Sequence, residues 1–590
     1  MEAIRDAPFG QLVRYLTNNK YFQYPEEQPD FKLPEQWVLL MNNGDLATKP
    51  SRDGSSDDEK TVLEDSQPPP SLAPSAERIS RTSSQDTLSF TESQLEADIQ
   101  HEIEKVRSIP VATRKTKDGS ILVDWYYTDD AENPHNWSNT KRALVTTLIC
   151  LYTFVVYTTS AIYTSSAEGI MKQFGVNDLL ATLGLSLYVL GYGAGPLVFS
   201  PLSEIPVIGR NPVYIITMFL FVIISIPTSL VGNFAGLMVL RFLQGFFGSP
   251  CLASGGASIG DLYSLISLPY AMMAWVSAAY CGPALGPLLS GFAVPAETWR
   301  WSLFESIWAS APVFLLMLFF LPETSSATIL LRRAERLRRI YNNDRFMAQS
   351  EIDQRNMKVS HVAIDALIKP LEITIKDPAV LFVQVYTAII YGIYYSFFEA
   401  FPLVYPVDYH MNLGQVGLVF LCILVACIIG IAVYVAYIYY WLNPRIARFG
   451  FGAQEERLLP ALPASFGPTI GLFLFAWTAR ASIHWIVPTI GITIYGATVF
   501  IVMQCIFVYI PLSYPQYAAS LFAANDFFRS ALACGSVLFA HPLFGNLGIA
   551  RGVSLLGGLS VIGIIGVWLL YFYGARLRAL SKFAQSSSSE

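Results

Sequence analysis

The class of fold is decided by residues 262–296, which read LYSLISLPYAMMAWVSAAYCGPALGPLLSGFAVPA. These 35 residues contain no Asp, Glu, Lys or Arg. A helix needs about 20 apolar residues to cross the ~30 Å hydrocarbon core of a bilayer. Backbone groups left unpaired in that core are costly, so a segment that crosses it must pair them within a helix. Residues 262–296 therefore predict a transmembrane helix.

Similar stretches without these four charged residues occupy most of residues 141–590. Six of the twelve stretches precede a charged segment at 323–377, and six follow it. The sequence therefore predicts an all-α integral membrane protein, with one six-helix half at 141–322 and another at 378–575. The other stretches are 143–167, 179–203, 211–240, 242–260, 306–322, 378–398, 411–444, 458–479, 481–525, 530–550 and 552–575.

The charge balance separates an acidic tail from the membrane part. Residues 1–140 hold 14 Lys/Arg and 25 Asp/Glu, a net of −11, whereas residues 141–590 hold 25 and 20, a net of +5. Over the whole chain 53% of residues are hydrophobic and only 14% are charged, which excludes an ordinary soluble protein. Within the tail, residues 50–92 are rich in Ser, Pro, Asp and Glu, and we expect them to be disordered.

The loops between the predicted spans differ strongly in basic residues. If the N-terminus is cytoplasmic, the inside segments carry 19 Lys/Arg and the outside loops carry 4. Positively charged loops stay on the cytoplasmic side. We therefore expect cytoplasmic tails at 1–140 and 576–590, a cytoplasmic central loop at 323–377 and a multi-pass protein of the plasma membrane.

Two segments outside the spans are predicted to form amphipathic helices. Residues 8–20 place Phe9, Leu12, Val13 and Leu16 at helical spacing, which fits a helix packed on the bundle or one that binds a partner. The central loop carries five arginines among Leu and Ile, which fits a helix on the anionic inner leaflet or one that only sets the topology. These arginines are Arg332, Arg333, Arg336, Arg338 and Arg339.

Enzymes and ATP-driven pumps are not indicated by the motifs. None of the 13 lysines follows a glycine, so the phosphate-binding loop GxxxxGK[ST] is absent. Six plus six spans around a central loop are typical of a duplicated transporter whose site lies between the halves. We expect no cofactor, no metal and no nucleic-acid partner. Transport would then be driven by an ion gradient.

Span four carries an arginine in a region where charge is costly. Arg241, Gln244, Gly245 and Gly248 fall on one helical face. An arginine at the centre of a span costs at least about 2.5–3.5 kcal/mol, so it normally faces a cavity or a partner. Two interpretations stay open: Arg241 takes part in proton coupling through a nearby carboxylate, or it hydrogen-bonds carbonyls of neighbouring helices.

Few carboxylates lie within the spans, which narrows the candidates for proton coupling. Glu399 in span seven is one of them. Asp526 and Arg529 in span eleven are one turn apart, so they either pair only with each other or also contact substrate.

Aromatic residues surround Glu399 along span seven. Such rings bind flat or cationic organic ligands through stacking and cation–π contacts. The alternative is a lipid-exposed aromatic belt. The candidates for a substrate cavity are Tyr391, Tyr394, Tyr395 and Phe398.

Span five contains a stripe of small residues at every fourth position. The stripe allows two helix backbones to approach closely. Pro283 and Pro287 lie beside it, each following a glycine, and each proline removes a backbone donor and bends the helix. The pattern fits a tight helix contact, or a bent helix at a moving interface between the halves. The stripe comprises Ala274, Ala278, Gly282, Gly286 and Ser290.

Several of these motifs resemble those of the major facilitator superfamily, and in particular of the fungal drug:proton antiporters. The resemblance covers nearly the whole chain. The run Gly282-Pro283 to Gly286-Pro287, closed by Ser290-Gly291, is similar to the antiporter motif of span five. Arg241-Phe242-Leu243-Gln244-Gly245 resembles the proton-linked motif of span four. Ser200-Pro201-Leu202-Ser203-Glu204, followed by Gly209-Arg210-Asn211-Pro212, resembles the family's loop motif after span two. Two residues more than in that motif separate Glu204 from Gly209.

The resemblance implies a monomer that works by alternating access of two six-helix halves. It implies export of toxic lipophilic compounds, antifungal drugs or a self-made toxin, in exchange for protons. It assigns Glu204, Gly209 and Arg210 to a gating loop and Gly282, Pro283, Gly286, Pro287 and Gly291 to the antiporter motif. Proton coupling would involve Arg241, Gln244, Glu399, Asp526 and Arg529, and Asn525 would join the substrate cavity. The alternatives are a proton symporter that imports a sugar, polyamine or siderophore, and a transporter-like sensor.

Overall fold

The structure is a computed structural model. It describes residues 2–42, 108–264, 267–354, 368, 371–449, 453–514 and 518–581, except residues 112 and 117. The stretch at 50–92, predicted to be disordered, lies outside the described residues. Twelve helices in the described part are long and apolar enough to cross a membrane, which confirms the predicted spans.

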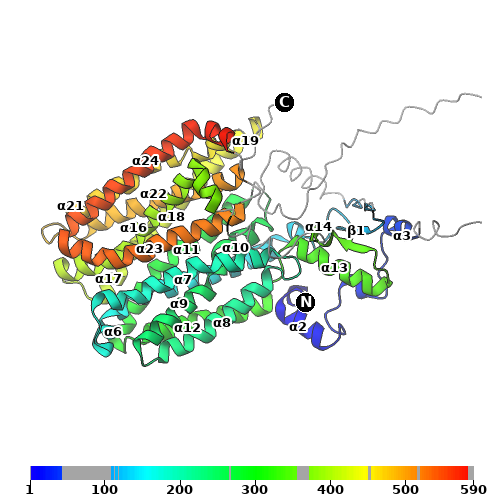
Figure 1. Cartoon of the computed structure of the whole chain (residues 1–590), viewed down its shortest axis with the longest axis horizontal. Helices are drawn as coiled ribbons and strands as arrows, with labels where there is room; N and C mark the ends of the chain where they lie inside the picture. Colours follow the sequence, from blue (N-terminus) through cyan, green and yellow to red (C-terminus); the bar gives the residue numbers. More distant parts are fainter. Residues whose placement is uncertain are drawn as a thin grey trace, which may run out of the picture.

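The twelve spans form one elongated bundle, in which the helices run side by side (Figure 1). The first half consists of α5 (Asn139–Ala161), α7 (Asp178–Glu204), α8 (Arg210–Leu230), α9 (Phe234–Gly248) continued by α10 (Pro250–Gly260), α11 (Leu268–Ala296) and α12 (Trp301–Phe320). The second half consists of α16 (Pro378–Tyr409), α17 (Leu413–Val419) continued by α18 (Leu421–Tyr437), α21 (Gly467–Thr478), α22 (Ile486–Ser513), α23 (Ala518–Leu547) and α24 (Ile549–Leu580).

Several spans begin at a polar residue that caps the helix. The side chains of Ser138, Asn177, Asn233 and Asn412 accept hydrogen bonds from the first free backbone N–H groups of α5, α7, α9 and α17. Such caps satisfy donors that the helix itself cannot pair. They explain where these four helices begin.

The two halves meet along two pairs of helices. Helix α7 packs against α23, and α11 packs against α17 and α18. Residues from the first and the second half therefore face each other in the middle of the bundle, where a transport site is expected.

Both ends of the described chain lie at the same end of the bundle, and a small folded unit that includes the N-terminal helices projects from that end (Figure 1). We call this the tail end, and the opposite one the far end. The small unit, named the tail unit, contains α1 (Glu2–Asp6), α2 (Pro8–Leu16), α3 (Glu35–Asn42), β1 (Ile121–Val123), α13 (Ser326–Tyr341), β2 (Phe346–Ala348) and α14 (Gln349–Gln354). Strands β1 and β2 pair in parallel, with Ile121 opposite Phe346.

The tail unit joins the segment before the first span to the loop between the halves. Its apolar core draws on both: Leu33, Trp37, Ile121, Val123, Tyr126, Leu331, Ala334, Leu337, Phe346 and Ala348. The sequence pattern did not indicate this association, because each strand is only three residues long.

Two arginines of α13 are buried in the tail unit. Arg333 is 1% exposed and Arg336 8% exposed. Arg333 pairs with Asp130 at 2.7 Å, and Glu132 lies 3.2 Å from Arg333 and 2.9 Å from Arg336. The interpretation that this helix rests on the inner leaflet is therefore wrong for Arg333 and Arg336, whose charges face the acidic tail.

The two carboxylates of this cluster respond differently to burial. Burial alone raises the pKa of Asp130, but the charge and hydrogen bonds of Arg333 outweigh it and hold the pKa below its ordinary value. Burial raises the pKa of Glu132 in spite of the nearby Arg333 and Arg336. The fold thus favours a charged Asp130 more strongly than a charged Glu132.

Candidate transport site between the halves

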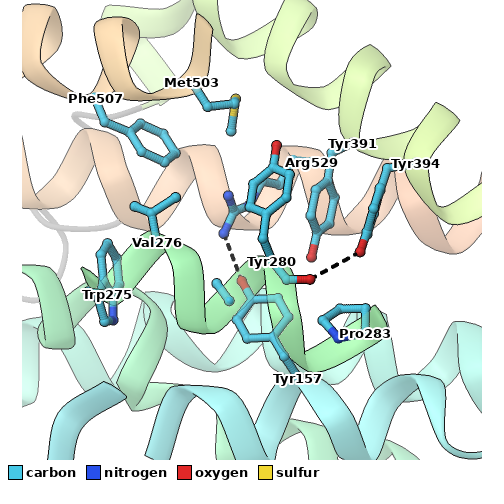
Figure 2. Close-up of a pocket in the computed structure, with 11 residues that line it drawn as sticks. Tyr157, Trp275, Val276, Tyr280, Pro283, Tyr391, Tyr394, Met503, Phe507 and Arg529 are labelled. Atoms are coloured by element: carbon cyan, nitrogen blue, oxygen red, sulfur yellow. Dashed lines mark hydrogen bonds between the residues drawn. The ribbon is translucent and has the colours of Figure 1, made fainter. Parts of the chain in front are cut away.

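A cavity of about 30 Å³ lies between the two halves, close to the middle of the bundle. Tyr157, Trp275, Tyr280 and Pro283 line it from the first half. The second half contributes Tyr391, Tyr394, Met503, Phe507 and Arg529 (Figure 2). Cavities that hold drug-sized ligands measure about 300–1,000 Å³. The structure therefore represents a closed conformation of this site, with room for little more than water.

Tyrosine hydroxyl groups link the halves beside this cavity. The Tyr192 hydroxyl on α7 is hydrogen-bonded to the hydroxyls of Tyr391 and Tyr395 on α16, the latter at 2.9 Å. The Tyr395 hydroxyl lies 3.3 Å from the Ser160 hydroxyl on α5. The Tyr394 hydroxyl donates to the Tyr280 carbonyl on α11 at 3.4 Å (Figure 2). These bonds must break if the halves separate.

The buried pair Asp526–Arg529 lies at the same place. The Asp526 Oδ1 and Arg529 Nη2 atoms are 2.6 Å apart within α23. Arg529 also donates to the Tyr157 hydroxyl of the first half at 3.1 Å, and its guanidinium lies 4.8 Å from the Tyr391 ring centroid. Arg529 therefore pairs within its own helix and also lines the cavity, so the alternative in which the two residues pair only with each other is wrong, and contact with substrate stays a prediction.

The predicted aromatic cavity residues lie inside the bundle. Tyr394 is 6% exposed, Tyr395 0% and Phe398 2%. The lipid-belt alternative is therefore wrong for these three rings. Tyr391 and Tyr394 line the central cavity. Phe398 instead stacks on Phe420 of the second half, with the ring centroids 5.2 Å apart.

Asn525 lies in a neighbouring small cavity between α16, α22 and α23. Its side-chain amide donates to Gln384 Oε1 at 2.6 Å and to the Thr387 hydroxyl at 2.7 Å. The structure thus places Asn525 beside the central cavity, not among the residues that line it.

Arg241 is fully buried in the first half. Its guanidinium donates to the carbonyls of Gly184 and Thr159, each at 3.2 Å, and to Gln244 Oε1 at 3.0 Å. It also lies over the rings of Tyr188 and Tyr163, 4.4 and 4.8 Å from their centroids. Among the described residues it forms no ion pair with a carboxylate. This arrangement matches the alternative in which Arg241 binds carbonyls of neighbouring helices.

Helix α11 uses its glycines for two different contacts. A Cβ at Gly286 would lie 2.8 Å from the backbone nitrogen of Ile162, so Gly282 and Gly286 pack α11 tightly against α5 of the same half. A Cβ at Gly291 would lie 2.7 Å from the Leu413 carbonyl of α17, in the other half. A Cβ at Gly417 would lie 2.7 Å from the Pro287 carbonyl. The antiporter-like motif therefore forms a close contact between the halves only at its Pro287–Gly291 end.

The fold and the geometry of this site can be compared with known proteins. The family model of the Major Facilitator Superfamily matches residues 149–537. The chain belongs to the Major Facilitator Superfamily. It is therefore a multi-pass membrane protein, and its relatives in this superfamily are transporters.

Three fungal relatives are similar over most of the chain. The MFS-type transporter pyvG of Aspergillus violaceofuscus is 46% identical over 470 residues, 80% of this chain and 86% of that protein. The cycloheximide resistance protein of Candida maltosa is 36% identical over 595 residues, 98% and 99% of the two chains. Fluconazole resistance protein 1 of Saccharomyces cerevisiae is 39% identical over 474 residues, 80% and 86% of the two chains.

A solved structure supports the facilitator fold. The proton:xylose symporter XylE, bound to 6-bromo-6-deoxy-D-glucose, superposes with a TM-score of 0.53 at 14% identity, over 74% of this chain and 96% of XylE. At this identity the likeness shows the fold alone.

Glu399 of this facilitator lies outside the central cavity. It is 8% exposed and forms no hydrogen bond or ion pair with the described residues. Asp178, at the start of α7, is close enough to interact with it electrostatically. Asp178 in turn lies 3.4 Å from His541 of α23, so polar groups of the two halves are in contact near the far end.

Residues of the predicted gating loop contact two carboxylates elsewhere in the chain that sequence reasoning missed. Arg210 pairs with Asp261, just after α10, at 3.2 Å, whereas Glu204 is exposed and forms no ion pair with it. The Glu323 carboxylate accepts hydrogen bonds from the backbone N–H groups of Arg210 and Asn211, both at 3.2 Å.

Gly209 makes this capping contact possible. It adopts φ +79°, and a Cβ there would lie 2.4 Å from Glu323 Oε2. Glu323 therefore caps α8 from the end of α12. In the sequence Asp261 and Glu323 stand out only as charges that border apolar stretches, which does not identify them as partners of Arg210 and Asn211.

Proposed function

We propose that this protein exports lipophilic organic compounds, antifungal drugs or a self-made toxin among them, in exchange for protons. The observation that carries the proposal is the wall of the inter-half cavity, in which six aromatic residues lie beside Arg529, the cation of a buried ion pair. Such a wall suits flat or cationic organic molecules, because it offers stacking and cation–π contacts. The names of the fungal relatives, which refer to cycloheximide and fluconazole resistance, support the same substrate class.

Proton coupling is assigned to the Asp526–Arg529 pair. In the closed conformation Asp526 pairs with Arg529, and Arg529 donates a hydrogen bond to the Tyr157 hydroxyl of the other half. A proton on Asp526 would remove the carboxylate charge and leave the Arg529 cation without its partner, so the contact with Tyr157 would change with protonation. The role of Arg241 and Gln244 would be to fix α5, α7 and α9 relative to one another through carbonyl hydrogen bonds.

The available driving force is sufficient for export. A membrane potential of 100 mV supplies about 2.3 kcal/mol per elementary charge, and one pH unit adds about 1.4 kcal/mol. Together these hold a concentration ratio of roughly 500-fold for one proton per substrate.

The proposal places the protein in the plasma membrane as a monomer, with the tail end in the cytosol. The 19 to 4 distribution of Lys/Arg between the two sets of loops supports this orientation. Protons would then enter from the far end, where Glu399, Asp178 and His541 lie.

Transport measurements in proteoliposomes test the function. With the voltage clamped at zero and a pH difference imposed, labelled fluconazole or cycloheximide should accumulate in the direction opposite to proton movement. Accumulation in the same direction as the protons would indicate the symporter alternative, for which xylose is a suitable probe. Movement at an equal rate after the pH difference is collapsed would refute proton coupling.

A further inference from the structure

Helix α2 has an apolar face that no described element of the chain covers. Ala7, Gly10 and Arg14 mark its buried face. On the opposite side Leu12 is 54% exposed, Tyr15 83% and Leu16 72%. A large apolar face left uncovered in this way normally marks a binding surface.

The buried face fixes α2 firmly in place. Arg14 forms two hydrogen bonds of 2.7 Å with the Glu27 carboxylate and donates to the Phe22 carbonyl at 2.6 Å. Asp6, just before α2, pairs with Lys141 at the start of α5 at 3.2 Å. The exposed face therefore has a defined direction relative to the bundle.

Helix α2 docks where the lipid-facing surface of the bundle ends. It packs against α12 and α8, and the Phe9 ring lies 4.7 Å from the Phe319 ring. Phe319 continues the outward stripe of α12 at helical spacing, in which Trp308 is 55% exposed, Leu315 51% and Leu316 40%. Phe9, Leu12 and Leu16 repeat the same spacing on α2. The Phe9–Phe319 contact thus joins the outward apolar stripe of α12 to the apolar face of α2.

We propose that α2 lies in the membrane interface and that Leu12, Tyr15 and Leu16 enter the boundary between lipid headgroups and acyl chains. The partner is the lipid surface, because the exposed face continues a surface that lipid already covers. Helices of this kind lie in the plane of the membrane with their apolar face about 5–10 Å deep. Tyr15 and Tyr21, which is 58% exposed, suit the headgroup level, where aromatic rings with a polar tip collect.

Charge has little part in this contact. The basic residues of α1 and α2, Arg5 and Arg14, are both paired with carboxylates. We therefore expect α2 to insert equally well into neutral phosphatidylcholine and into bilayers that contain anionic lipid.

Fluorescence quenching in nanodiscs tests the proposal with the full chain. In a background in which the seven native cysteines are replaced, the variant Leu16→Cys, labelled with a polarity-sensitive fluorophore, is compared with Leu39→Cys. Leu39 is 60% exposed on α3, a helix that lies far from the bundle in Figure 1. Nanodiscs of phosphatidylcholine with brominated acyl chains should quench the label at position 16 by roughly half, because the acyl boundary is within its reach. The label at position 39 should remain unquenched.

The outcomes separate lipid from other occupants. Equal, weak quenching at both positions, with the label at position 16 open to a water-soluble quencher, would overturn the proposal. Protection of position 16 from both quenchers would indicate a protein occupant and would overturn it equally. Neither variant tests transport, so the result stands apart from the proposed export function.

Discussion

Single hydroxyl groups hold the halves of this transporter together at its centre. The Tyr192 hydroxyl contacts Tyr391 and Tyr395, and all three rings are tightly packed. A neutral hydrogen bond contributes about 1 kcal/mol. Each of these hydroxyl contacts therefore contributes a small energy to the closed conformation, which a bound molecule can offset.

Replacing Tyr192→Phe removes the hydrogen bonds to Tyr391 and Tyr395 and should shift the population away from the closed conformation by about fivefold for each lost bond. The native Cys281 and Cys427, which belong to one packed cluster with residues of both halves, report on closure. Oxidative cross-linking between them, detected by mass spectrometry of the digested protein, should slow. The control is Tyr214→Phe, which removes a 2.8 Å bond to Ser258 within the first half. An equal effect of both variants would remove Tyr192 from the closure mechanism.

The Asp526–Arg529 pair can be tested by neutralising its members singly and together. Asp526→Asn leaves a buried cation without its partner and should lower stability by about 3–5 kcal/mol. The double variant Asp526→Asn/Arg529→Gln should recover most of that stability but not proton-driven transport, measured as thermal unfolding and as accumulation in proteoliposomes. Glu305→Gln, which neutralises a carboxylate of α12, should leave transport intact. Recovery of transport in the double variant would show that the pair is only structural.

In the tail unit, Asp130 and Glu132 should respond differently to neutralisation. Asp130→Asn should cost about 3 kcal/mol at neutral pH, because a lowered pKa means that the fold favours the charged form. Glu132→Gln should cost clearly less, because burial raises the pKa of Glu132. Hydrogen exchange of residues 118–135 and 326–341, followed by mass spectrometry, gives the comparison.

The contribution of Asp130 should also depend on pH in a defined direction. It is present above its unfolded pKa of about 3.9 and is lost as pH falls through the lower pKa of the folded state. Equal protection from exchange in both variants would contradict the assignment.

At the scale of elements, α11 carries two kinds of contact on one helix. Gly286 packs within the first half, whereas Gly291 meets α17 of the second half. Only the second contact has to change when the halves move. The sequence predicts the stripe but not this division of roles, because the identity of the opposing helix is a property of the tertiary fold.

The variant Gly291→Ala should therefore alter transport more than stability. Its Cβ would lie 2.7 Å from the Leu413 carbonyl, so the far end of α11 must move outward and the closed state becomes less favourable. We expect a several-fold change in the transport rate at normal expression. Gly535→Ala on α23, where a Cβ meets nothing within 4 Å, is the matched control. A normal rate for Gly291→Ala would exclude this contact from the transport cycle.

The spans could be predicted from the sequence because the length of an apolar run is a local property. The partners of buried charges could not be. Arg241 binds carbonyls of Thr159 and Gly184, which belong to other helices and leave no mark in composition. Arg210 pairs with Asp261 and not with Glu204, although Glu204 is nearer in sequence. Long-range pairing of this kind depends on how the helices are arranged.

At the scale of the whole molecule, the tail unit ties the start of the first half to its end. Strand β1 precedes the first span, and β2 follows the sixth, yet the two strands pair in parallel. The buried arginines of α13 strengthen this connection through Glu26, Asp130 and Glu132. The segments before and after the first half are thus joined before the chain continues into the second half.

The parallel pairing of β1 with β2 imposes an order on biosynthesis. The ribosome releases residues 121–123 early, but their partner strand at 346–348 emerges only after six hydrophobic segments have passed through the translocon. Until then the acidic tail cannot pair with the arginines of α13. The two-stranded sheet can therefore form only after the first six segments have been synthesised. In a nascent chain interrupted before residue 346, strand β1 would lack its partner and would be open to proteases and chaperones.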